Sequence, residues 1–324
     1  MDGVQDGIEN GINTYCLTLI EHGDLRLRAT ANGYMPRTID EGFRDFLTRL
    51  TPSIAESQAA KNHRASIEAS LTNNFALKRF VRIGSFGNGT SISGYSDVDY
   101  LACLPTEQLT QVSTSSLTKV RNALDSRFPN TGVRVSCPAV VVPFGTTLAE
   151  TTEIVPADYV REDNGYKIYD IADCAGGWMK ASPDAHNAYV RWVDDKLGNK
   201  VKPLIRFLKA WKCYREVPIS SFYLELRVAK YASDEKSIVY EIDVRNVLKL
   251  LWDGQLARMQ DPMEVSGYIP ACKSDAFRDD ALSKVGTALT RAEKAREASV
   301  KDNISDAFYW WRLLFNDQFP TYYF

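Results

Sequence analysis

The stretch Arg82-Ile-Gly-Ser-Phe-Gly-Asn-Gly-Thr-Ser-Ile-Ser-Gly-Tyr-Ser-Asp-Val-Asp-Tyr100 decides the fold that we expect for this chain. An apolar run from Phe80 to Ile83 leads into it and stops at Gly84-Ser85, which is typical of a buried strand that turns sharply into a loop or a helix. A turn of this kind presents backbone N–H groups and a hydroxyl group to an anion. The first half of the stretch therefore predicts a phosphate-binding turn at Gly84 and Ser85.

The second half of the stretch opens another apolar strand, which runs to Leu104. Because successive side chains of a strand alternate between its faces, Asp97 and Asp99 share one face, and Val98 and Tyr100 share the other. Two adjacent carboxylates repel each other unless a cation lies between them, and such oxygen ligands suit Mg²⁺. We interpret Asp97 and Asp99 as metal ligands; the alternative is a polar strand edge in water.

The pattern consists of a strand, Gly-Ser, eleven further residues and an apolar strand with Asp-x-Asp. In this order it resembles the DNA polymerase β-like nucleotidyltransferase superfamily. The two-metal mechanism of phosphoryl transfer needs a third carboxylate opposite the Asp pair. Glu153, in the short strand 151–155, is the candidate. The alternative interpretation of Glu153 is an edge-strand glutamate that faces water.

Composition and charge are those of an ordinary globular protein. The chain has 324 residues, 44% hydrophobic and 25% charged, which is enough for two lobes. The net charge of −2 favours neither nucleic acid nor membrane as a partner. No apolar run reaches membrane-spanning length and the N-terminus has no secretion signal, so we expect a cytoplasmic protein. The six cysteines lack C-x-x-C spacing and are predicted to be buried free thiols.

Hydrophobic periodicity predicts an α+β fold in two lobes. In the first lobe we expect helices over 38–50, 54–71 and 109–128, strands over 133–142 and 151–155, and a loop-rich segment over 156–183. In the second lobe we expect helices over 187–197, 201–215, 221–232, 241–252, 275–298 and 303–316. We place the boundary near residue 185, between a catalytic lobe (1–185) with N-terminal helices and a helical lobe (186–324). Residues 1–35 predict no clear element.

The segment 201–212 predicts an amphipathic helix with a basic stripe opposite its apolar face. The stripe consists of Lys202, Arg206 and Lys209. Such a stripe is usually only the solvated side of a helix. Here the next helix begins with the hydroxyl groups of Ser220 and Ser221, followed by the ring of Phe222 or Tyr223. Phosphates bind lysine charges and hydroxyl donors, and bases stack on aromatic rings, so this segment predicts a nucleotide site.

The ordered set of motifs resembles one family over about residues 55–320, the bacterial cGAS/DncV-like nucleotidyltransferases of the SMODS type. The motifs are Gly84-Ser85 with Asp97-x-Asp99, Glu153-Ile-Val-Pro-Ala157, Leu208-Lys-Ala-Trp211, Ser221-Phe-Tyr-Leu-Glu225 and Tyr309-Trp-Trp-Arg-Leu-Leu-Phe315. The resemblance implies a two-lobed polymerase β-like fold, in which a mixed sheet carries the metal site and a helical lobe closes the nucleotide cleft.

The same resemblance implies the roles of the site residues. The metal ligands would be Asp97, Asp99 and Glu153, holding two Mg²⁺ ions, for which Mn²⁺ is an alternative. The residues that bind the donor nucleotide would be Gly84, Ser85, Lys209 and Ser221, with Phe222 stacking on a base. The third acid is often Asp in this family, so Glu153 departs from the pattern.

The family implies a synthase that makes a cyclic di- or trinucleotide messenger from NTPs, such as ATP and GTP, in bacterial antiphage defence of the CBASS type. Expected partners are a receptor of the product and a regulatory protein, with no membrane and no strong nucleic-acid signal. Two alternatives stay open: an enzyme that modifies RNA ends or a protein, and an inactive nucleotide-binding module. The modest charge disfavours RNA. The three mutually repelling acids disfavour an inactive pocket.

Overall fold

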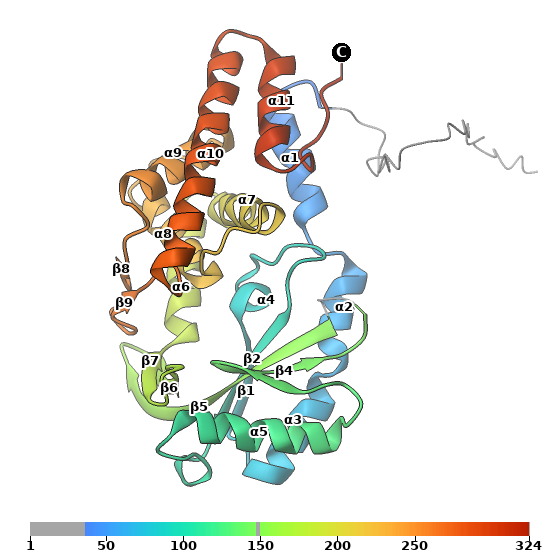
Figure 1. The fold of residues 1–324 in the computed structure, drawn as a ribbon, viewed down its shortest axis with the longest axis vertical. Helices are drawn as coiled ribbons and strands as arrows, with labels where there is room; N and C mark the ends of the chain where they lie inside the picture. The colour runs from blue at the N-terminus through green and yellow to red at the C-terminus, as the bar shows by residue number, and fades with distance from the viewer. Residues whose placement is uncertain (1–35, 147–149, 324) are drawn as a thin grey trace, which may run out of the picture. The chain divides into compact units, whose positions relative to one another are not determined.

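The computed structural model describes residues 36–146 and 150–323, in which a seven-stranded mixed sheet stands beside a group of helices (Figure 1). The strand order is β1-β2-β5-β4-β3, and β6 and β7 continue from β5. Strands β2 and β5 are parallel, whereas the other neighbours are antiparallel. The bounds are β1 Arg79–Ile83, β2 Val98–Leu104, β3 Arg134–Ser136, β4 Ala139–Pro143, β5 Thr151–Asp163, β6 Tyr166–Ala172 and β7 Trp178–Ala181.

One face of the sheet is covered by α3 (Arg64–Phe75) and α5 (Ser113–Arg127) (Figure 1). Tyr100 and Ile154 pack there in one buried apolar cluster with side chains of both helices. Strand alternation turns Asp99, the neighbour of Tyr100, to the other side. We call that other side the open face; its own apolar cluster is small and contains Leu101 and other side chains of β2, β5 and β6.

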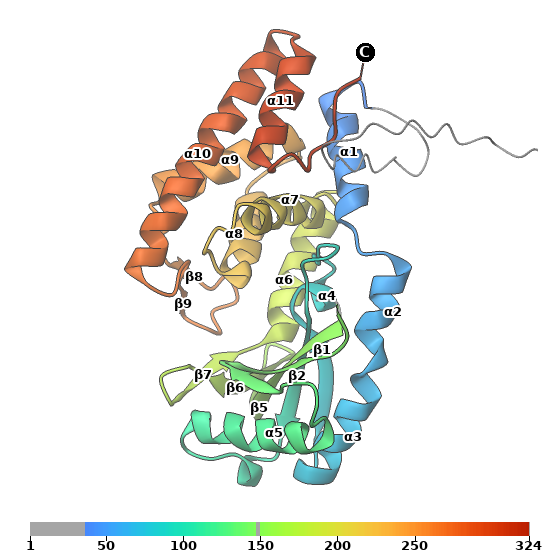
Figure 2. The same cartoon turned by 45° about the vertical axis from the view of Figure 1, so that its right-hand side comes forward.

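Helix α1 (Ile39–Leu50) and the helices α6 to α11, between Pro183 and Leu314, share a second, larger apolar core (Figure 2). Its centre is aromatic: Phe43 of α1 packs edge-on against Phe207 of α7 and Trp311 of α11. The bounds are α1 Ile39–Leu50, α2 Ile54–Asn62, α4 Gly84–Asn88, α6 Pro183–Lys196, α7 Val201–Tyr214, α8 Ser221–Ser233, α9 Tyr240–Asp253, α10 Asp275–Val300 and α11 Ile304–Leu314, with a short hairpin of β8 Met259–Gln260 and β9 Tyr268–Ile269. None of the described helices has the length and apolarity to cross a membrane.

The predicted α+β fold class is confirmed, and the predicted helices of the second lobe are present to within a few residues at either end. The boundary near residue 185 stays a prediction. One helix of the predicted first lobe, α1, contributes its apolar side chains to the core formed by α7 and α11. The N-terminal stretch that predicted no element, 1–35, lies outside the described residues.

Three predicted elements of the first lobe were wrong in extent. The strand expected over 133–142 is a hairpin: the chain reverses at Cys137-Pro138, and β3 pairs antiparallel with β4. The segment expected to be a loop over 156–183 is mostly sheet: β5 continues to residue 163 and turns at Asn164-Gly165, both with positive φ, into β6. The helix expected over 54–71 is interrupted at His63, between α2 and α3.

The cysteine prediction was wrong for two residues. Cys137 and Cys174, separated by 37 residues in the sequence, form a disulfide with Cα atoms 5.6 Å apart. The physical reason is the sheet, which brings the β3–β4 turn next to the chain that follows β6. Cys103, Cys213 and Cys272 are free thiols, although only Cys103 is fully buried. Cys16 lies outside the described residues.

Candidate active site

Three carboxylates lie together at one end of the open face. Asp99 of β2 and Glu153 of β5 are direct partners in the parallel register, and Asp97 comes one residue before β2. The carboxyl groups of Asp97 and Glu153 are hydrogen-bonded to each other. The structure therefore brings together all three acids that the sequence singled out, and it places the third one on the strand next to Asp99.

Gly84 makes room for this cluster. It is the first residue of α4, directly after β1, and its φ of +59° is a conformation that favours glycine. A Cβ atom at residue 84 would overlap the carboxyl group of Asp99. The sharp turn predicted at Gly84-Ser85 is thus present, and it packs against the acid that it precedes by 15 residues in the chain.

Asp99 and Glu153 hold their protons more strongly than isolated carboxyl groups do. Burial raises the pKa of Asp99 well above its usual value, and the charges of Asp97 and Glu153 raise it further. Burial also raises the pKa of Glu153 to about 7; the charge and hydrogen bond of Asp97 add to this effect, and the positive charges of Arg134 and Lys273 oppose it. A cation placed between such groups would stabilise their ionised forms.

These donors fit a magnesium ion only in part. Although the three carboxyl groups are neighbours, no three His, Cys, Asp or Glu side chains in residues 36–146 and 150–323 are arranged so that all three could bind one metal ion. Mg²⁺, however, is usually held by one or two carboxylates and keeps waters and substrate phosphates as its other ligands. Asp99 and Glu153 have raised pKa values and lie on the open face of the sheet, so their carboxyl oxygens suit that kind of site.

The basic stripe predicted on α7 does not face solvent as a row of free charges. Arg206 donates from Nε to the carbonyl oxygen of Ser91 at 3.1 Å, and Lys202 lies 3.7 Å from the Asp194 carboxylate. Lys209, the third member, is buried. The stripe therefore holds α7 to its neighbours, and its first two members are structural.

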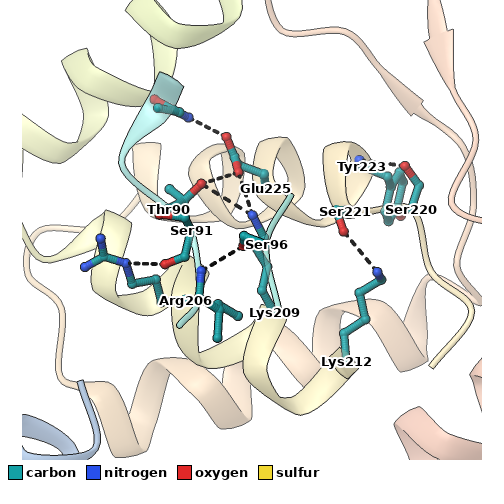
Figure 3. Close-up of polar contacts among 12 residues, drawn as sticks. Thr90, Ser91, Ser96, Arg206, Lys209, Lys212, Ser220, Ser221, Tyr223 and Glu225 are labelled. Atoms are coloured by element: carbon teal, nitrogen blue, oxygen red, sulfur yellow. Dashed lines mark hydrogen bonds and ion pairs between the residues drawn. The ribbon is translucent and has the colours of Figure 1, made fainter. Parts of the chain in front are cut away.

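Lys209 sits in a network centred on Glu225 of α8 (Figure 3). Its Nζ is 3.4 Å from Glu225 Oε2 and 3.5 Å from Thr90 Oγ1. Glu225 also accepts hydrogen bonds from Thr90 Oγ1, at 2.6 Å, and from Asn88 Nδ2. Because Asn88 and Thr90 follow the Gly84-Ser85 turn, Glu225 ties that turn to the helices α7 and α8.

Lys212, one turn further along α7, is the lysine that meets Ser221. Its Nζ donates to Ser221 Oγ at 2.9 Å (Figure 3). Ser221 is exposed and begins α8, whose N-cap is Ser220. Burial lowers the pKa of Lys212, whereas the nearby Cys213 and Asp97 favour its charged form. Lys209 and Ser221 were predicted as a pair of phosphate ligands. The charge of Lys209 acts on Asp99, whereas Ser221 meets Lys212, and no hydrogen bond joins Lys209 to Ser221 within the described residues.

Phe222 is the exposed ring at the start of α8. Its side chain is 43% exposed, and its ring packs edge-on against His186 with centroids 5.0 Å apart. His186 in turn forms a 2.9 Å hydrogen bond between Nε2 and Asp261 Oδ2. Tyr223 is buried and donates its hydroxyl proton to the carbonyl oxygen of Ala257. Of the two rings weighed from the sequence, only Phe222 is free to meet a base.

Sequence reasoning missed two polar residues of this site. Lys212 is three positions after Lys209, so the helical period that gave the basic stripe could have included it. Glu225 lies inside a motif that the sequence singled out, but only the fold shows that it accepts from the segment after Gly84-Ser85.

Comparisons with known proteins agree with this geometry. Residues 37–194 match the family model of the Second Messenger Oligonucleotide or Dinucleotide Synthetase domain, SMODS. A probable cyclic nucleotide synthase of Bacillus cereus is 35% identical over 81 residues, which are 24% of this chain and 24% of that protein. The chain thus aligns with about a quarter of the length of this curated relative.

Solved structures with the same fold cover most of the chain. Escherichia coli MS115-1 CdnC, solved with ATP, has a TM-score of 0.68 at 18% identity, over 86% of this chain and 98% of CdnC. Vibrio cholerae DncV, a cyclic AMP-GMP synthase solved with a linear intermediate, has a TM-score of 0.58 at 14% identity, over 87% of this chain and 88% of DncV. Together with the SMODS match over residues 37–194, these likenesses show that the chain shares its fold with solved nucleotide synthases such as DncV.

Proposed function

We propose that this protein joins NTPs into a cyclic di- or trinucleotide by two successive phosphodiester-forming steps, each releasing pyrophosphate. The observation that carries the proposal is the grouping of Asp97, Asp99 and Glu153 on one open face, with Asp99 against the Gly84-Ser85 turn. Acids for metal ions and donors for phosphates are what nucleotidyl transfer needs, since catalysis there is mainly positioning and charge stabilisation.

The acids would hold Mg²⁺, or Mn²⁺ in its place, with Asp97 and Asp99 on the donor side and Glu153 completing the site for the acceptor. When bound, the ions lower the pKa of the attacking hydroxyl group and neutralise charge on the departing pyrophosphate. In each step the acceptor hydroxyl oxygen bonds to the donor α-phosphorus, the bond to the β-phosphate oxygen breaks, and the hydroxyl proton leaves to solvent.

The helical side of the site would hold the donor nucleotide. Ser221 and Lys212 offer a hydroxyl group and an ammonium group at the start of α8, and the charge of Asp97 acts on Lys212. Ser85 offers a further hydroxyl group from the turn, and Phe222 offers an exposed ring for a base. Lys209 would join the phosphate ligands by exchanging its contact with Glu225 for one with a phosphate oxygen.

The relatives support NTP substrates and suggest two classes of partner. CdnC was solved with ATP, and CdnG of Bradyrhizobium diazoefficiens with GTP. CdnC was also solved in complex with a HORMA protein. We extend to this chain the use of ATP or GTP, control by a regulatory protein, and a receptor for the cyclic product in cytoplasmic antiphage defence of the CBASS type.

One incubation tests the proposal against both alternatives. The protein is mixed with the four NTPs and Mg²⁺, treated with phosphatase, and the small products are separated and weighed by mass spectrometry. We expect one dominant resistant species of two or three nucleotides, because a ring has no terminal phosphate group to remove. Asp99→Asn is the matched control.

Three other outcomes would contradict the proposal. A phosphatase-sensitive ladder of lengthening products, or label transferred only to added tRNA, would indicate an enzyme that acts on RNA ends. Label transferred only to added protein would indicate a protein-modifying enzyme. Binding of NTPs without any turnover, with Mn²⁺ as well as Mg²⁺, would indicate an inactive binding module.

A further inference from the structure

We propose that His186 is a positioning residue for the donor nucleotide: with its imidazole fixed by Asp261, it orients the ring of Phe222 on which the base stacks. The inference rests on the proposed function and adds to it a dependence of base binding on two buried side chains. His186 belongs to α6, and Asp261 directly follows β8. Neither residue belongs to a motif that the sequence singled out.

Asp261 holds the imidazole of His186 in one orientation. The two side chains are 0% and 7% exposed, and His186 Nε2 lies 2.9 Å from Asp261 Oδ2. Because an ionised carboxylate only accepts hydrogen bonds, Nε2 carries the proton and donates. The carboxylate is itself fixed by the backbone N–H groups of Met263, Val265 and Ser266, which donate to it at 2.8–3.1 Å. A buried polar pair with this many hydrogen bonds is held rigidly, so the imidazole has little freedom to turn.

The backbone that carries Phe222 is fixed on both sides. The N–H of Ser220 donates to the carbonyl oxygen of Ala271 at 2.8 Å, and the hydroxyl group of Tyr223 donates to the carbonyl oxygen of Ala257 at 2.8 Å. Ala257 precedes β8 and Ala271 follows β9, so both flanks of the β8–β9 hairpin hold the first turn of α8. The position of Phe222 is therefore set, and what stays variable is the rotation of its side chain.

His186 restricts that rotation. The rings of His186 and Phe222 lie with centroids 5.0 Å apart and planes at 72°, close to the edge-to-face arrangement that aromatic pairs favour. Among the residues that the structure describes, His186 is the one aromatic side chain in ring contact with Phe222. An exposed phenylalanine without such a neighbour can occupy several χ1 rotamers. Phe222 is 43% exposed, so the contact selects one orientation and leaves part of the ring open to a ligand.

The base and the phosphates of the donor would thus depend on different side chains. Ser221, the residue before Phe222, accepts from Lys212 Nζ at 2.9 Å, and within the described part of the chain no hydrogen bond joins either of them to His186 (Figure 3). A ring that is oriented before binding loses no rotamer freedom when a base stacks on it. Release of Phe222 should therefore weaken binding of the base and leave the phosphates bound as before.

The test separates the base from the phosphates. A 2′,3′-dideoxy NTP serves only as donor, and an NTP with an α,β-methylene bridge serves only as acceptor, so one linear dinucleotide forms. We measure the KM of the donor, and the Ki of inorganic tripolyphosphate, which has no base, in competition with that donor. The variants are His186→Gln, Phe222→Leu and the double variant. His186→Gln keeps an N–H group for Asp261 but removes the ring.

Two further variants complete the set. His63→Gln is the matched control, because His63 also stacks on a phenylalanine, Phe144, with centroids 3.8 Å apart, but Phe144 belongs to the apolar cluster beneath α3 and α5. Asp261→Asn keeps both rings and weakens the hydrogen bonds to the former carboxylate, including the one that fixes the imidazole. It therefore tests the inference even if His186→Gln does not fold. Melting curves establish which variants are folded.

We expect His186→Gln to raise the donor KM roughly three- to tenfold, the range of an aromatic pair, and to leave the Ki of tripolyphosphate unchanged. Phe222→Leu should raise the same KM at least as much, since it removes the ring on which the base stacks. Adding His186→Gln to Phe222→Leu should change nothing further, because His186 acts through that ring. Asp261→Asn should give a smaller rise, and His63→Gln should equal wild type.

Equal rises in the donor KM and in the Ki of tripolyphosphate would overturn the inference, since they would mean that His186 only supports the fold around α8. A rise that His186→Gln causes equally in the Phe222→Leu background, or wild-type donor KM values in the folded His186 and Asp261 variants, would overturn it as well. If wild type joins no nucleotides at all, the proposed function fails and this inference falls with it; if wild type is active and the variants match it, only this inference fails.

Discussion

The Cα atom of Gly84 faces the Asp99 carboxyl group so closely that a Cβ atom there would overlap it, and the φ of Gly84 is +59°. Gly84→Ala should therefore lower the free energy of unfolding, by about 1–2 kcal/mol from the backbone conformation alone, and should also displace Asp99 and abolish activity. Chemical denaturation and the NTP assay measure the two effects. Gly94→Ala is the control, because φ is also positive at Gly94 but no atom lies within 4 Å of its Cβ position. Equal losses in both variants would contradict the packing argument.

Asp97→Asn and Asp99→Asn should each abolish product formation and leave the melting temperature level or higher in the absence of divalent cations. Each change removes a metal ligand and at the same time relieves repulsion among buried carboxyl groups. Added Mg²⁺ should raise the melting temperature of wild type more than that of either variant. Full activity in either variant would contradict the assignment of that residue as a metal ligand.

Glu153→Gln should lose most activity, whereas Glu150→Gln should lose little. Glu153 is on β5 beside Asp99, but Glu150 precedes the strand and its carboxylate lies against the backbone at Gly145 and Thr146. Steady-state rates with Mg²⁺ compare the two variants. The reverse ranking would mean that the third acid is misplaced.

Loss of Lys209 and loss of Lys212, both on α7, should differ in their effect on stability. Lys212→Ala should raise the KM for NTPs at a nearly unchanged melting temperature. Within the described residues the ammonium group of Lys212 hydrogen-bonds only to the hydroxyl group of Ser221, and a lost charged phosphate contact costs about 1.5–3 kcal/mol. Lys209→Ala should lower the melting temperature, because it leaves Glu225 without its cation. The NTP assay and a thermal melting curve are measured for both variants. If Lys209→Ala is as stable as wild type, the Glu225 contact is weak and Lys209 is free to bind phosphate.

Stability at acid pH should depend on Asp261. Its burial opposes ionisation, but hydrogen bonds from His186 and from backbone N–H groups outweigh burial and lower the pKa to about 2. Because this pKa is below the value of about 3.9 in the unfolded chain, the carboxylate stabilises the fold above pH 4, and its contribution is lost as the pH falls from about 4 to about 2. The stability difference between wild type and Asp261→Asn, measured in urea, should shrink over that range. A difference that does not change with pH would contradict the assignment.

The sequence predicted the centre of the site better than its surroundings. Gly84, Asp97 and Asp99 lie within 16 residues of each other, so strand alternation and turn chemistry were enough to group them. Glu153 was found because the order of the motifs is typical of a superfamily. The β5–β6 hairpin was missed although Asn164-Gly165 is a strong turn signal.

Long-range contacts could not be predicted in this way. The disulfide between Cys137 and Cys174 and the contact of His186 with Asp261 depend on how the sheet and the helices pack. Periodicity gives the face of an element on which a side chain lies. It does not give the neighbour that the side chain meets.

Glu225 receives side chains from both halves of the site, Asn88 and Thr90 on one side and Lys209 on the other. If a donor phosphate draws Lys209 away, the Glu225 carboxylate keeps its two neutral donors but loses its cation. The free energy of that lost ion pair makes nucleotide binding less favourable. If donor binding weakens the join between the turn and α8, thermodynamic linkage requires the reverse effect as well. A molecule that binds and loosens this join must change the affinity for the donor by the same factor by which the donor changes the affinity for that molecule. A regulatory protein that shifted only this join could set the working NTP concentration of the enzyme without touching a metal ligand.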